Sequence, residues 1–200
     1  GSGPVTYKYG PSIAVDPQGN PHITYYDQQE EDLVLASRGA SEWTISTVDG
    51  EGDTGLFSSF VIDETGRFHV SYLQRTSIVS GVVKYATKAP GDTAWEVRDV
   101  HTLDRLTFGT VGARNITSVS VDSRGNPWIT YSDEKTLRLA IWTGSRWQIE
   151  AVVEDAGLQT LGQLVSLKLD SQDQPHIAYF QVTSQRPPEG IVKYARGTPK

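Results

Sequence analysis

One motif occurs four times in this sequence and limits the folds that it can adopt. The stretch VDPQGNPHITYYD at 15–27 returns as IDETGRFHVSYLQ at 62–74, VDSRGNPWITYSD at 121–133 and LDSQDQPHIAYFQ at 169–181. The motif aspartates are Asp16, Asp63, Asp122 and Asp170, which lie 47, 59 and 48 residues apart. Repeats of this length are typical of architectures in which similar units stack side by side and share a core.

Three further markers recur in the same order. A tyrosine follows each motif aspartate by nine residues, and an alanine then closes a segment of alternating apolar residues, such as DLVLA or TLRLA. In the first three units a tryptophan next opens a segment such as WTISTV. Each complete unit therefore contains four segments rich in β-branched and aromatic residues, bounded by turn residues. No stretch has a helical period, so the sequence predicts an all-β protein of four-stranded antiparallel units.

These units resemble the blades of bacterial β-propeller proteins, and their hairpins are similar to NHL and Asp-box repeats. The segment SVDSRGNPW from Ser120 contains the serine, aspartate, glycine and tryptophan of the Asp-box pattern. The resemblance covers Pro11 to about Arg196 and implies a single four-bladed β-propeller over residues 1–200. The blades are expected near 11–49, 58–101, 117–153 and 165–200. Propellers serve as hydrolases, lyases, lectins and protein-binding platforms, so the resemblance implies no single function.

The fourth unit lacks the tryptophan that begins the last segment of the other three. The alanine-to-tryptophan spacing is 7 or 9 residues, and seven residues after Ala195 would be position 202, beyond Lys200. The outer strand of the fourth blade is therefore expected from elsewhere. The segment PVTYKY at 4–9 is our first choice for closing the ring; a second chain or further blades of a larger propeller are the alternatives.

The repeated histidines invite a metal-binding interpretation. His22, His69 and His176 occupy one position of the motif, and Trp128 replaces them in the third unit. A need for blade packing acts on every unit, whereas one ligand site needs a specific geometry. We therefore expect each histidine to bond its own aspartate or the next blade, with no metal. The aspartates are likewise expected to cap turn amides rather than bind calcium or catalyse.

Composition and motifs exclude several classes of function. A net charge of −6 and a pI near 5.2 disfavour nucleic acid as a partner. No apolar run reaches the ~18 residues of a membrane span, and the absence of cysteine removes thiolate chemistry. We find no nucleophile elbow, HExxH motif or phosphate-binding glycine loop. We therefore assign no catalytic residue and no cofactor, and expect a non-catalytic protein.

Function is expected in the segments that do not repeat, because loops carry specificity on a repetitive frame. The connections between blades and the turns between second and third strands should share one face, which we call the loop face. There we expect a protein or glycan ligand, contacted by Arg105, Phe108 and Arg114 of the 101–116 connection with Arg75 and Arg186. The protein is expected to be extracytoplasmic or secreted.

Three alternative functions remain open. In a lectin, Trp43, Trp95 and Trp147 would each stack on a sugar between blades, although packing between blades is the simpler role. A glycan hydrolase or lyase would need clustered carboxylates outside the repeat. A structural assembly module would form a homo-oligomer through an open blade edge.

Overall fold

The computed structural model describes residues 10–39, 41–104, 116–133, 136–154, 161–185 and 188–197, which form strands, turns and bends but no helix. The first sheet contains β1 (Ser12–Val15), β2 (Pro21–Asp27), β3 (Asp32–Arg38) and β4 (Trp43–Asp49). The second contains β5 (Asp53–Ile62), β6 (Phe68–Arg75), β7 (Gly81–Lys88) and β8 (Glu96–Leu103). The third contains β9 (Thr117–Val121), β10 (Pro127–Asp133), β11 (Thr136–Trp142) and β12 (Trp147–Glu154), and the fourth β13 (Leu161–Leu169), β14 (Pro175–Gln185) and β15 (Pro188–Arg196).

Each sheet is an antiparallel meander whose strands are adjacent in chain order. Such sheets are the blades of a β-propeller, which confirms the predicted fold class. The fourth sheet has three strands among the described residues, as expected for a unit whose outer strand comes from elsewhere. The segment 4–9, proposed as its fourth strand, lies outside the described residues.

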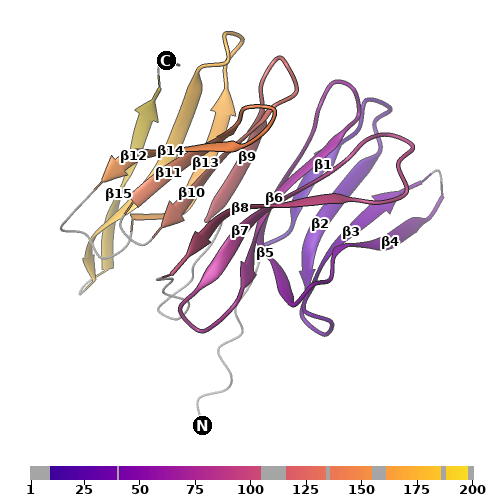
Figure 1. Ribbon diagram of the computed structural model, residues 1–200, viewed down its shortest axis with the longest axis horizontal. Coiled ribbons are helices and arrows are strands. Elements are labelled where there is room, and N and C mark those ends of the chain that lie inside the picture. Colours follow the sequence, from indigo (N-terminus) through magenta and orange to yellow (C-terminus); the bar gives the residue numbers. More distant parts are fainter. Residues whose placement is uncertain are drawn as a thin grey trace.

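The four sheets lie side by side along the long axis of the molecule, with the first at one end and the fourth at the other (Figure 1). The first strand of each later sheet contacts the first two strands of the sheet before it: β5 contacts β1 and β2, β9 contacts β5 and β6, and β13 contacts β9 and β10. None of these extensive contacts joins the fourth sheet to β1. The described residues therefore form an open array of blades.

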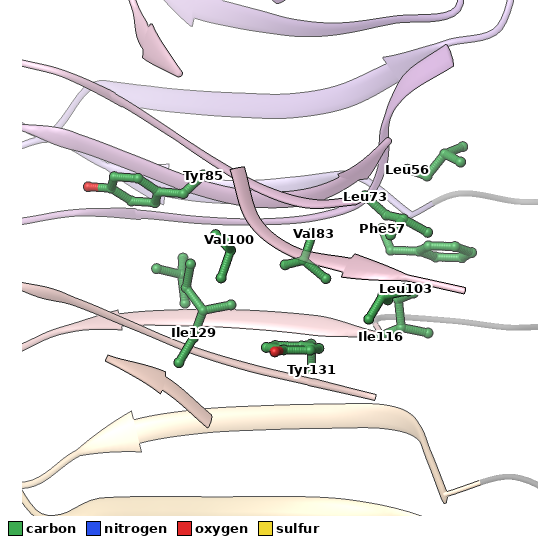
Figure 2. Packing of buried hydrophobic residues seen from close by; sticks show 12 residues of the cluster. Leu56, Phe57, Leu73, Val83, Tyr85, Val100, Leu103, Ile116, Ile129 and Tyr131 are labelled. Atoms are coloured by element: carbon green, nitrogen blue, oxygen red, sulfur yellow. The ribbon is translucent and has the colours of Figure 1, made fainter. Parts of the chain in front are cut away.

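Three hydrophobic clusters fill the junctions between successive sheets. Side chains alternate between the two faces of a strand, so each inner sheet contributes to two clusters. Figure 2 shows the cluster at the second junction, where Val83 and Tyr85 of the second sheet face Ile129 and Tyr131 of the third. The same alternation at both ends of the array leaves one face of the first sheet and one face of the fourth without a neighbouring sheet in the part of the chain that the structure describes.

A serine in the first strand of each of the first three sheets accepts a backbone bond from the following sheet. Ser12 Oγ accepts the N–H of Phe60 at 3.0 Å, and Ser59 and Ser118 repeat this bond to the following sheet at 3.1 and 3.0 Å. All four units have a serine four residues before the motif aspartate, Ser166 being the last. The first strands of the four sheets also line a cavity of about 290 Å³.

Candidate functional site

The motif aspartates stabilise the turns between first and second strands. Asp16 Oδ1 accepts the N–H groups of Gln18 and Asn20 at 3.0 and 2.7 Å, and the other three aspartates repeat this pair of bonds. The turns require a left-handed residue three positions after the aspartate, which is glycine in three units and Asp173 in the fourth. The predicted capping role is thus confirmed.

The motif histidines bond their own aspartates, which is one of the two arrangements that we expected. The Nε2 atoms of His22, His69 and His176 lie 3.2, 3.1 and 3.1 Å from Oδ2 of the aspartate six residues earlier. In the third unit the indole of Trp128 donates to Asp122 at 3.3 Å. The repeated position therefore needs an N–H donor, which both side chains supply.

Hydrogen bonding and burial set the protonation of these groups. The Asn20 side chain is the main cause that lowers the pKa of Asp16 to about 2, and the N–H of Gln174 is the main cause that lowers the pKa of Asp170 to about 2. Burial lowers the pKa of His69 below its ordinary value even though Asp63 opposes the shift. His69 is therefore neutral at neutral pH, with Nε2–H donating to Asp63 and Nδ1 accepting from the Tyr85 hydroxyl at 2.6 Å.

The turns of the last three sheets surround a depression of about 660 Å³ on the face opposite the loop face. Its aspartates are already engaged: Asp63, Asp122 and Asp170 by their own turns, and Asp173 by the backbone and hydroxyl of Ser123 at 2.9 and 2.6 Å. Within the described ranges, no three histidine or acidic side chains gather in a way that could hold a metal ion.

Two of the three tryptophans considered for sugar stacking lie against the preceding blade. Trp95 packs against the cluster at the first junction and Trp147 against the cluster at the second. Trp147 also meets Tyr85 of the preceding blade edge-to-face, with ring centroids 5.6 Å apart. Among the described residues no blade precedes Trp43, which is 43% exposed, with the Arg38 guanidinium 5.8 Å from its ring. A sugar-stacking role for the three stays a prediction.

The loop face brings together the ends of second strands and the starts of first strands, as the sequence predicts. The N–H of Thr54, at the start of β5, donates to the carbonyl of Glu31, in the turn after β2, at 2.9 Å. Arg75 ends β6 and forms an ion pair with Asp53, which also accepts the Tyr26 hydroxyl at 2.9 Å. The other predicted ligand-binding residues, Arg105, Phe108, Arg114 and Arg186, lie outside the described residues.

A buried polar cluster joins the first two blades beneath this face. The carboxylate of Asp49 accepts the Tyr72 hydroxyl at 2.6 Å and pairs with Lys84 Nζ at 2.8 Å. Burial alone would raise the pKa of Asp49, but the bonds from Lys84, Tyr72 and the N–H of Glu51 outweigh it, and the pKa lies below its usual value. Burial and the Asp49 charge raise the pKa of Tyr72, so its phenol stays protonated.

The corresponding cluster at the second junction is incomplete. His101 and Tyr131 are the repeat equivalents of Asp49 and Tyr72, and their ring centroids are 5.7 Å apart. Among the described residues, the buried atoms His101 Nδ1 and Tyr131 Oη have no hydrogen-bond partner. Burial lowers the pKa of His101 and raises that of Tyr131, so both groups are neutral at neutral pH. We call this pair, with the neighbouring Arg138–Asp133 ion pair (2.7 Å), the second-junction site.

The second-junction site corrects one sequence interpretation. The sequence predicted that the connection between the second and third blades begins at position 101, whereas His101 lies in β8, six residues after Trp95. The equivalent residues in the first and third sheets are Asp49 and Val153. The sequence does show that the residue at this repeat position differs from unit to unit. Positions that vary within a repeat are the ones free to serve function. The pairing with Tyr131 depends on how the two blades pack, which the sequence does not show.

Comparisons with known proteins support the fold and no family. No known protein family and no curated protein sequence matches the chain. The similarity to NHL and Asp-box repeats therefore stays at the level of the propeller fold. No helix among the described residues is long and apolar enough to cross a membrane.

Solved structures of similar fold include an ulvan lyase bound to a fragment of glucuronic acid and 3-sulfated rhamnose, with a TM-score of 0.66, 12% identity, and coverage of 99% of this chain and 57% of that one. A protein of unknown function from Dyadobacter fermentans gives 0.60 and 11%, over 94% and 65%. The intramolecular trans-sialidase of Ruminococcus gnavus, in complex with oseltamivir carboxylate, gives 0.53 and 14%, over 89% and 40%. The chain thus spans between about two fifths and two thirds of these proteins.

Proposed function

We propose that this protein is a non-catalytic recognition module that binds an anionic glycan on its loop face. The observation that carries the proposal is the second-junction site, where His101 Nδ1 and Tyr131 Oη are buried without partners among the described residues. Unsatisfied buried polar groups are costly and cluster where ligands or waters bind. A sugar hydroxyl both donates and accepts, so one hydroxyl can bond a neutral imidazole nitrogen and a phenol together.

An anionic ligand is proposed because the sequence predicts several arginines on the loop face. Arg75 is partly exposed at the end of β6, and Arg105, Arg114 and Arg186 are expected in neighbouring loops. Arginine suits planar carboxylates because its guanidinium donates two parallel bonds. The ulvan lyase and the trans-sialidase are bound to ligands that bear acidic groups, which is consistent with this choice for a protein of the same fold. A glycan ligand also fits the extracytoplasmic location that the sequence suggests.

Non-catalytic binding is favoured over a lyase or hydrolase. Tyr72, the phenol beside buried Asp49 and Lys84, has a raised pKa and donates a hydrogen bond to Asp49, so it stays protonated and is a poor general base. A protein ligand on the same face is the second candidate, since arginine and aromatic residues are also enriched in protein interfaces.

The first experiment is an array of oligosaccharides that contains uronates, sialylated sugars and matched neutral sugars. We expect binding to at least one acidic glycan, weakened by added salt. Tyr131→Phe should then weaken binding about tenfold, the equivalent of one lost hydrogen bond of about 1.4 kcal/mol. It should leave the melting temperature unchanged or raised, because the hydroxyl that it removes has no partner among the described residues.

Tyr72→Phe is the matched control, since it removes the hydroxyl at the equivalent repeat position. That hydroxyl bonds Asp49, so this variant should lose stability and keep its glycan affinity. Arg75→Ala should weaken binding of acidic sugars with little change in stability, because partly exposed ion pairs contribute little to folding. Equal affinity of Tyr131→Phe and wild type for the bound glycan would refute the site. An array without any binding would refute the glycan and favour the protein ligand.

A further inference from the structure

The fourth blade exposes apolar side chains at positions that are buried in every other blade. Val192 and Tyr194 of β15 are 78% and 61% exposed. Alignment on the repeated alanine pairs them with Leu33 and Leu35, Val83 and Tyr85, and Leu137 and Leu139. All six of these residues are at most 5% exposed, because the following blade covers them. We call this surface, defined by Val192 and Tyr194, the trailing face.

The first blade exposes the complementary surface. Ile13 and Val15 of β1 are 61% and 58% exposed, and Trp43 of β4 is 43% exposed. The residues equivalent to Ile13 in the later blades are Phe60, Val119 and Leu167, at 4%, 2% and 1%. These residues, like the tryptophans equivalent to Trp43, pack against the preceding blade. We call the surface defined by Ile13, Val15 and Trp43 the leading face.

We propose that a second copy of this chain docks head-to-tail, with its leading face on the trailing face of the first. The proposed contact continues an interface that the chain already builds between its own blades. At each of the three junctions inside the array, the residues equivalent to the leading face of one blade pack on the residues equivalent to the trailing face of the blade before it. The leading face and the trailing face carry the same kinds of residues at the same repeat positions. Exposed apolar surface of this kind is typical of protein interfaces.

Two specific contacts follow from the repeat. Ser166 is exposed, and within the described residues no following strand donates to its hydroxyl as Phe60, Val119 and Leu167 donate to the equivalent serines. The N–H of Ile13 from a second copy takes this place. Trp43 of the second copy packs edge-to-face on Tyr194, as Trp147 packs on Tyr85 inside the chain.

The trailing face already has the side-chain arrangement that the internal junction uses. Tyr194 donates its hydroxyl to His176 Nδ1 at 2.7 Å, as Tyr85 does to His69 at 2.6 Å beneath the third blade. Little rearrangement is therefore needed for docking, which lowers its entropic cost. Two copies joined at both ends contain eight sheets, a number within the range of known propellers.

The test measures the oligomeric state of the full chain by sedimentation velocity and light scattering over a wide concentration range. We expect concentration-dependent association of the 22.0 kDa chain into dimers or longer head-to-tail assemblies. Ile13→Asp and Val192→Asp should each abolish association without lowering the melting temperature of the monomer, since both side chains are already exposed. Ile78→Asp is the control, because Ile78 is 85% exposed in the turn after β6 and belongs to neither face.

A mixture of the two face variants separates this contact from any other dimer. Ile13→Asp retains an intact trailing face and Val192→Asp an intact leading face, so an equimolar mixture should regain one contact and form a heterodimer. A wild-type chain that stays monomeric at every concentration would overturn the proposal. So would an assembly that survives both substitutions, one that Ile78→Asp also dissolves, or a mixture that remains monomeric.

Discussion

Removing the cation from the buried pair at the first junction tests the structure most directly. Lys84 and Asp49 have side chains only 6% and 4% exposed, and Nζ lies 2.8 Å from Oδ2. Lys84→Met leaves a buried carboxylate without its counter-charge, a change that costs about 3–5 kcal/mol. Asp49 keeps the Tyr72 hydroxyl at 2.6 Å and the N–H of Glu51 at 3.1 Å, so we place the loss at about 3 kcal/mol. For a chain of this length that lowers the melting temperature by about 6–12 °C.

Urea unfolding at neutral pH, followed by tryptophan fluorescence and circular dichroism, measures the effect. Lys193→Met is the matched control, because Lys193 occupies the equivalent position in β15 and is half-buried without an ion pair among the described residues. This control variant should change the free energy of unfolding by less than about 0.5 kcal/mol. The double variant Lys84→Met/Asp49→Asn removes both charges and should recover about 2 kcal/mol or more relative to the sum of the single variants. A loss below about 1 kcal/mol for Lys84→Met, or strict additivity, would refute the buried pair.

Other predictions test the frame. Ser59→Ala leaves a backbone N–H of the third blade without its acceptor and should lower the free energy of unfolding by about 1–3 kcal/mol in chemical denaturation. Ser166→Ala should lower it almost not at all in the monomer. Equal losses for the two variants would contradict the serine bonds between blades. Gly55→Ala should prevent folding or destabilise severely in thermal melts, because φ is +102° and a Cβ would lie 2.7 Å from the Cα of Leu33. The pKa of His69 is lower in the folded state than in the unfolded chain. The contribution of His69 to the free energy of unfolding is therefore complete above the unfolded-state pKa of about 6.5, and it is lost as the pH falls toward the folded-state pKa. His69→Gln should therefore flatten the decline in unfolding free energy between about pH 7 and pH 5, and an unchanged decline would count against a neutral buried imidazole.

The sequence predicts those parts of the structure that depend on bonds between near neighbours. The turn at Asp16 is built from residues no more than six positions away, including His22, so one unit of the repeat contains all the groups that it needs. Four copies of such a unit predict both the all-β blades and the structural role of the histidines. The sequence also predicts that the fourth unit does not supply its own outer strand, and the described residues of that unit form three strands.

The candidate site could be predicted only in part. The loop face follows from strand alternation, and Arg75 does lie there beside Asp53. The site itself depends on His101 and Tyr131, which belong to different blades and meet because β8 of one packs beside β10 of the next. Sequence alignment shows that position 101 differs from its equivalents, but not which residue of the neighbouring blade it faces.

The sequence by itself determines the repeat, its turns and the alternation that gives every blade two apolar faces, because these depend on local backbone preferences and short-range bonds. The tertiary structure decides which of those faces are covered. Leu33 and Val192 occupy the same repeat position and have similar chemistry, yet one is fully buried and the other 78% exposed. The difference arises because burial depends on the presence of a neighbouring blade, and only the internal junctions of the array supply one.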